Sequence, residues 1–146
     1  MIRLSPWGRI ALLLLLGCGS EPDDRIVGTY ALVGVEGTAL PYLEWSDGEC
    51  DQFISEGELN LEPAGTYTLE FSGPLDCSTG QPSTLGRLYA GTVTQSGGEF
   101  VFQAEIQGAG TLQFTGSVNP LEAFVTVPPI PPATGPDLTL QFAIVP

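Results

Sequence analysis

The chain has 146 residues, 17 acidic against four basic side chains, no histidine, and a formal net charge of −13 at pH 7. The four basic residues are all arginines, so the usual imidazole base, Schiff-base amine and histidine ligand for zinc or haem are missing. The acidic balance excludes a nucleic-acid partner, because almost nothing could neutralise phosphates, and the length allows one domain of ordinary size.

The N-terminal segment has the pattern of an export signal. Residues 1–9 carry two arginines and no acid, and residues 10–16 form an apolar run that is too short to span a bilayer but suits a signal-peptide core. The run ends in Leu15-Leu16-Gly17-Cys18, which resembles the lipobox of bacterial lipoproteins. The resemblance implies cleavage before Cys18 and attachment of diacylglycerol to its thiol. Ordinary secretory cleavage beside an incidental cysteine is the alternative.

On this interpretation the chain divides into a signal peptide (1–17), a lipidated tether (18–25) and one domain (26–146). Two or three acyl chains hold a protein firmly, so the resemblance implies a protein anchored through Cys18 to an extracytoplasmic face of a bacterial membrane. Gly19 stands where enteric lipoproteins retained at the inner membrane have aspartate, which favours the outer membrane. The mature chain would keep two basic against 17 acidic residues, a net charge of −15.

Cys50 and Cys77 remain as a pair once Cys18 is lipidated. In an oxidising compartment an even pair predicts a disulfide, and closing this loop stabilises the fold by roughly 3 to 4 kcal/mol. Two free thiols are the alternative, which we do not expect outside the cytoplasm. The pair lacks the further ligands that a metal site would need.

From Ile26 onward apolar residues alternate with a period of two, and turn signals recur every 8 to 12 residues, which is typical of an all-β domain. Because each expected strand has one apolar and one polar face, the sheet should be antiparallel. We expect eight strands, at residues 26–35, 58–62, 65–72, 85–94, 99–106, 111–118, 122–127 and 137–144.

The turn at residues 62–65 predicts a hairpin with a type I turn and a left-handed Gly65. This register pairs Leu61 with Tyr67 and brings Leu59 opposite Leu69. Extended outward, it places the two cysteines within one residue of being opposite each other. Residues 42–51 are the least regular part, and could hold a short helix or close one end of a barrel.

The strand that begins Gly28-Thr29-Tyr30, with Leu32, Val35, Gly37 and Leu40-Pro41 after it, resembles the lipocalin-like domains of bacterial lipoproteins. The hairpin at residues 65–69, the cysteine pair and the segment 89–93 (Tyr-Ala-Gly-Thr-Val) match that group too. The resemblance covers residues 26–145 and implies a small antiparallel eight-stranded β-barrel. A β-sandwich of the same strands is the alternative architecture, since both alternate in and out.

A barrel of this size either packs solid or holds one small ligand. We expect a filled core, because a domain of about 120 residues needs most of its apolar side chains for stability. An apolar pocket for a lipid or pigment is the functional alternative. Its candidate lining is formed by inward-facing aromatic side chains, namely Tyr30, Tyr67, Phe71, Phe100, Phe102, Phe114 and Phe142.

Other polar residues give weaker signals. Asp47, Glu49 and Asp51 alternate around Cys50, but the pattern lacks the glycine and terminal glutamate of a calcium loop, so we expect a solvated acidic loop and no metal or cofactor. Arg87 shares an expected strand face with Tyr89. It could meet a buried carboxylate, cap a barrel end, contact an acidic ligand group, or simply be exposed.

Enzyme activity is not expected. No carboxylate pair is marked by an apolar setting, and no nucleophile motif with an activating base occurs. Two functions remain for a membrane-anchored lipoprotein. It binds a small apolar ligand in its barrel, or it is an envelope or surface interaction module with a packed, ligand-free barrel. Trp45, in the least regular segment, is the candidate centre of an interaction patch.

Overall fold

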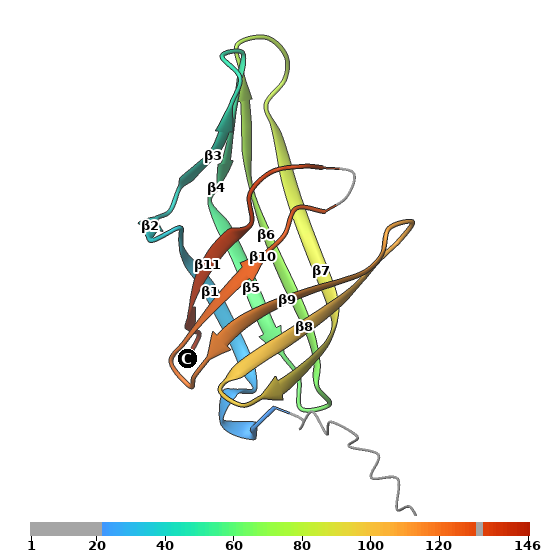
Figure 1. The fold of residues 1–146 in the computed structure, drawn as a ribbon. Coiled ribbons are helices and arrows are strands. Elements are labelled where there is room, and N and C mark those ends of the chain that lie inside the picture. The colour runs from blue at the N-terminus through green and yellow to red at the C-terminus, as the bar shows by residue number, and fades with distance from the viewer. Residues whose placement is uncertain (1–21, 131–132) are drawn as a thin grey trace, which may run out of the picture.

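The computed structural model describes residues 22–130 and 133–146, so the expected signal peptide and Cys18 lie outside the described residues. This part of the chain is nearly all β (Figure 1). None of its helices is long and apolar enough to cross a bilayer. A short 3-10 helix, η1 (Asp24–Ile26), precedes strands β1 (Gly28–Val35), β2 (Thr38–Ala39), β3 (Tyr42–Ser46), β4 (Cys50–Ile54), β5 (Glu56–Leu61), β6 (Thr66–Cys77), β7 (Ser83–Ser96), β8 (Glu99–Ile106), β9 (Gly110–Val118), β10 (Glu122–Val127) and β11 (Leu138–Ile144).

Eight of these strands close into an antiparallel barrel. The ring runs β1-β11-β10-β9-β8-β7-β6-β5 and returns to β1, where Gly28 pairs with Leu61 and Tyr30 with Leu59. Because the ring is closed, the domain is a barrel and not the β-sandwich considered as the alternative. Its eight members are the eight strands expected from the sequence, and the architecture is compatible with a lipocalin-like fold.

The turn between β5 and β6 sets the register of the first long hairpin. Gly65 has a φ of 75° and its N–H donates to the carbonyl of Glu62 over 3.1 Å. The predicted pairs follow, with Leu61 opposite Tyr67 and Leu59 opposite Leu69. This register is confirmed.

Beyond the barrel, β6 and β7 continue into a four-stranded sheet with β3 and β4. We call this sheet the extension; it consists of β3, β4, residues 72–77 of β6 and residues 83–86 of β7. Residues 50–52 of β4 pair with residues 75–77 of β6, and β3 pairs with β4. The extension rises from one end of the barrel, while η1 lies at the other end (Figure 1).

The extension includes most of the segment that the sequence left unassigned. Residues 42–51 form no helix; they contain β3 and the start of β4, which lie in the extension at one end of the barrel. A register shift between Leu43 and Trp45 interrupts the alternation of this short strand. Gly48, with a φ of 88°, then turns the chain into β4. These two features hide the period of two by which the other strands were recognised.

The interior of the barrel is a packed apolar core. Every strand of the ring contributes side chains to it, and along most of each strand the buried inward positions alternate with more exposed ones. Its buried members include Ile26, Tyr30, Leu32, Val35, Leu59, Leu61, Tyr67, Leu69, Phe71, Tyr89, Val93, Phe100, Phe102, Ala104, Phe114, Ala123, Val125, Val127, Leu138, Leu140 and Phe142.

Candidate functional site

The aromatic residues proposed as a pocket lining are buried inside the barrel, and several of them pack on one another. Tyr67 meets Phe102 edge to face with 4.9 Å between ring centroids. Phe102 stacks on Phe114 at 5.4 Å, and Tyr89 meets Phe114 edge-on at 5.4 Å. Such rings contribute both buried area and specific ring contacts. All seven proposed residues are at most 6% exposed: Tyr30, Tyr67, Phe71, Phe100, Phe102, Phe114 and Phe142.

Three tyrosine hydroxyls inside the barrel have different environments. The Tyr30 hydroxyl donates to the carbonyl of Ile26 over 2.8 Å and lies 3.2 Å from that of Asn119. The Tyr89 hydroxyl donates to the carbonyl of Pro128 over 2.6 Å. The Tyr67 hydroxyl is buried with no hydrogen-bond partner among the described residues.

Burial of these tyrosines disfavours the charged phenolate. It raises the pKa of Tyr67 and of Tyr30, and it raises the pKa of Tyr89 to about 12. At Tyr89 the positive charge of Arg87 acts in the opposite direction, toward a lower pKa. All three side chains are therefore neutral in the folded protein near pH 7.

We call the end of the barrel from which the extension rises the mouth. An ion pair lies there. The Arg87 guanidinium pairs with the carboxylate of Glu44, and its carbon atom lies 5.5 Å from the centroid of the Phe71 ring. The Arg87 side chain is 29% exposed and that of Glu44 is 12% exposed. Of the alternatives left open by the sequence, the structure thus selects the one in which Arg87 meets a largely buried carboxylate. Glu44 comes from the segment that the sequence left unassigned.

A hollow of about 180 Å³ lies beside this ion pair on the inner face of the extension. Trp45 and Leu85 stand at its rim, 40% and 47% exposed. Gln52 lies in its wall and is 3% exposed; its Nε2 donates to the carbonyls of Phe53 over 2.7 Å and Gly73 over 3.4 Å. Trp45, singled out from the sequence, therefore has an apolar neighbour from a distant strand.

A second hollow, a groove of about 450 Å³, lies across the outer face of β5, β6 and β7. Its floor includes Gly86, and Leu88 on its wall is 56% exposed. Three carboxylates, those of Glu56, Glu58 and Glu70, stand along it. The groove is thus an acidic surface with an apolar border. No sequence motif marked it, because its residues come from three strands.

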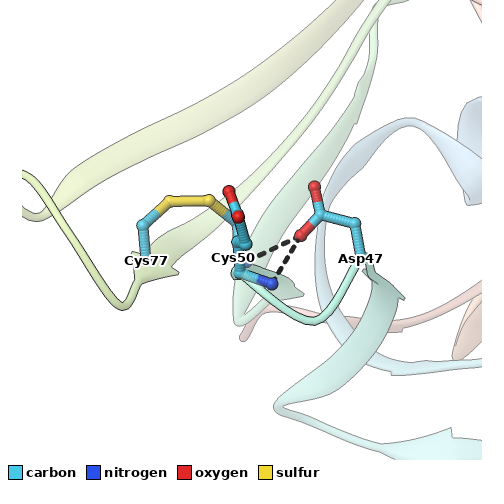
Figure 2. The surroundings of a disulfide bond; sticks show 4 residues. Asp47, Cys50 and Cys77 are labelled. Atoms are coloured by element: carbon cyan, nitrogen blue, oxygen red, sulfur yellow. Dashed lines mark hydrogen bonds between the residues drawn. A yellow bond between two sulfur atoms is a disulfide. The ribbon is translucent and has the colours of Figure 1, made fainter.

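The far end of the extension is closed by the predicted disulfide between Cys50 and Cys77, which are paired directly across β4 and β6. Figure 2 shows the Asp47 carboxylate accepting from the backbone N–H of Cys50 over 2.7 Å. The N–H of Glu49 donates to the same oxygen over 2.9 Å. These bonds favour the ionised form and lower the pKa of Asp47. Within residues 22–130 and 133–146, no three acidic or cysteine side chains gather as a metal site would require.

Comparison of the chain with protein-family models, with curated proteins and with solved structures finds no match. The barrel and its surface features must therefore be interpreted from their own geometry.

Proposed function

We propose that this chain is a membrane-anchored extracytoplasmic lipoprotein whose packed barrel serves as a rigid scaffold for contacts with another envelope protein. The observation that carries the proposal is the filled interior. As expected, the rings that were candidates for a pocket lining pack in one core with Leu59, Leu69 and Leu140, which are fully buried. A scaffold with a solid core meets its partner through its surface. The chain has no histidine or lysine to act as a catalytic base or amine, which suits a role without catalysis.

The first described residues, which follow the expected anchor in the sequence, lie at the end of the molecule opposite the extension (Figure 1). Strand β6 runs from Thr66, near η1, to Cys77 at the tip of the extension, and twelve extended residues span roughly 36 Å. Cys18 is four residues before Pro22, and so few residues reach about 14 Å at most. A lipid on Cys18 would hold the η1 end at the membrane, and the extension would face away from it.

The charge of the mature chain supports this orientation. Its balance of two basic against 17 acidic residues repels anionic headgroups, so the domain would stand off the surface to which its lipid attaches it.

The scaffold proposal is tested by native mass spectrometry of residues 19–146, exported to an oxidising periplasm and purified gently. We expect the mass of the bare chain, two hydrogens short because of the Cys50–Cys77 disulfide. A discrete added mass that is lost on organic extraction would overturn the scaffold proposal in favour of a carrier of a small apolar ligand.

The anchor is tested separately with the full chain expressed in a bacterium supplied with radiolabelled palmitate. We expect label in the parent chain and in Cys77→Ala, and none in Cys18→Ala. The two substitutions are matched, since each removes one thiol. A parent chain that carries no label would overturn the anchor.

A further inference from the structure

One edge of β7 has no neighbouring strand along half of its length. On one side, residues 83–92 of β7 pair with β6; on the other, β8 pairs only with residues 91–96. The pairing between β7 and β8 ends at Gly91 and Ala104. From there the hairpin of β8 and β9 turns away from β7 (Figure 1). In the described part of the chain, no backbone hydrogen bond from a loop reaches residues 83–90. The backbone groups on this edge are therefore free to pair.

This edge lacks most of the usual protections of an exposed strand, and its one charged side chain, Arg87, is neutralised by its pairing with Glu44. Natural edge strands are short, bulged, or carry lysine or proline, because an open regular edge recruits another strand. Residues 83–90 contain neither lysine nor proline, and their pairing with β6 shows no register shift. The exposed side chains of Leu85 and Leu88 lie on opposite faces of this segment. The edge is long, regularly paired and apolar enough to template an added strand.

The outer face beside this edge favours positive charge. Leu88, Glu70 and Glu58 form one row across β7, β6 and β5, and Glu58 stands directly opposite Glu70. Like charges in that position destabilise a sheet, so a cation placed between them relieves repulsion. In the next row, Gly86 has no side chain and Ser72 a short one. A long side chain from an added strand can therefore cross β7 there and reach the carboxylates.

The inner face beside the same edge favours an apolar group. Leu85 lies at the rim of the hollow of about 180 Å³, which also exposes Trp45. Arg87, the one cation on this face among the described residues, is already paired with Glu44. Side chains of a strand alternate between the two faces, so one added strand would meet both environments at successive residues.

We propose that the open edge of β7 binds an extended segment of a partner protein as an added antiparallel or parallel strand. Basic side chains of that segment point across β7 toward Glu70, which stands beside Glu58, and its apolar side chains lie toward Leu85 and Trp45. This inference rests on the proposed scaffold function and names the chemistry of its partner.

The test uses residues 19–146 with the disulfide intact and three fluorescent heptapeptides. The first alternates lysine and valine, the second alternates glutamate and valine, and the third has the first peptide's composition with lysines and valines grouped. We expect the alternating lysine peptide to bind at least tenfold tighter than either of the others in fluorescence polarisation. Its binding should slow hydrogen exchange of backbone amides within residues 83–90. Equal binding of the grouped peptide, or unchanged exchange there, would overturn the inference.

Variants of the protein separate strand addition from general attraction to an acidic surface. Gly86→Thr places a side chain where a long side chain of the added strand would cross β7. The new Cβ would lie 3.3 Å from that of Ser72, so the fold needs only a small adjustment. We expect at least a tenfold loss of affinity. The double variant Glu58→Gln/Glu70→Gln should lose three- to tenfold, whereas Glu99→Gln/Glu105→Gln on β8 should change affinity less than twofold. Equal losses in the two double variants would overturn the inference.

The two proposals fail separately. If native mass spectrometry finds a bare chain and the lysine peptide does not bind, the strand-addition inference is wrong and the scaffold stands. If a ligand is found in the barrel, the scaffold is wrong whatever the peptide does.

Discussion

Removing the same hydroxyl from three tyrosines of one barrel should change stability with different signs. The variants are Tyr30→Phe, Tyr67→Phe and Tyr89→Phe. Each deletes one oxygen atom and leaves the aromatic ring, so the packing contribution is almost constant across the series. What differs is the hydrogen-bond partner of the deleted group. The series therefore isolates the cost of a buried polar group that has no partner.

The magnitudes follow from the partners. Tyr30→Phe removes a hydroxyl that donates at 2.8 Å to a carbonyl and leaves that carbonyl buried without it, for a loss of about 1–2 kcal/mol. Tyr89→Phe removes one bond to Pro128, for a loss of about 1 kcal/mol. Tyr67→Phe removes a desolvated hydroxyl with no partner among the described residues, which should gain up to about 1 kcal/mol. Tyr67→Phe and Tyr30→Phe should thus differ by about 1–3 kcal/mol.

The assay is urea unfolding of residues 19–146 near pH 7, where the tyrosines are neutral. The slope of unfolding free energy against urea should be the same in all variants, so a shift of midpoint reports stability directly. In thermal unfolding, 1 kcal/mol corresponds to a change of about 4 °C for a domain of this size. Tyr42→Phe, on β3 and outside the barrel ring, serves as the control and should stay within about 0.5 kcal/mol.

One result would refute the reasoning. If Tyr67→Phe lost as much stability as Tyr30→Phe, the Tyr67 hydroxyl would have a partner inside the barrel. The interior would then hold a polar group that is not part of the packed core. The filled-core argument on which the proposed function rests would fail with it.

Three further predictions concern the extension, the mouth and alkaline pH. The double variant Cys50→Ala/Cys77→Ala should lose about 3–4 kcal/mol in urea unfolding, from loop-closure entropy across a separation of 27 residues; an unchanged midpoint would contradict this. Arg87→Met should lose about 2–4 kcal/mol because it leaves the Glu44 carboxylate largely buried and unpaired, and Glu44→Gln/Arg87→Met should recover most of that loss. Stability should be constant up to about pH 10 and then fall as pH rises toward 12. In the unfolded chain Tyr89 ionises with the ordinary tyrosine pKa of 10.0, whereas its folded pKa is about 12, so this residue alone accounts for a loss of about 2–3 kcal/mol by pH 12. Urea midpoints measured from about pH 9 to 12 check this loss of stability. The chain has no lysine, so no lysine titrates in the same range.

The barrel could be predicted because the sequence pattern that specifies each strand lies within that strand and its adjoining turns. Each of its eight strands alternates over enough residues to show which face is buried, and the turn at Gly65 fixes the register of the first hairpin. The disulfide was predicted from the even pair of cysteines, and the register of this hairpin placed the two residues within one position of their observed pairing. Strand β3 escaped prediction because a register shift between Leu43 and Trp45 breaks the alternation within five residues.

The site features could not be predicted because they depend on pairings between distant segments. The ion pair joins Glu44 to Arg87, 43 residues later. In the acidic groove, Glu58 of β5 and Glu70 of β6 stand side by side because the two strands are paired. The open edge of β7 has no sequence signature of its own. It exists because β8 stops pairing at Gly91, and only the three-dimensional course of β8 shows that.

Two glycines lie where β6 and β7 change or lose a neighbouring strand. A Cβ at Gly73 would clash with the backbone of Phe53, where β6 exchanges its partner β5 for β4. A Cβ at Gly91 would clash with the backbone of Gln103, where β7 begins to lose β8. At both points backbones approach too closely for any side chain, so glycine is required for packing. Because the changes of partner occur at these glycines, the barrel can keep a closed, filled core while β6 and β7 continue past it with one edge open. Gly91 thus lies where the closed barrel ends along β7 and where the edge proposed to bind a partner begins.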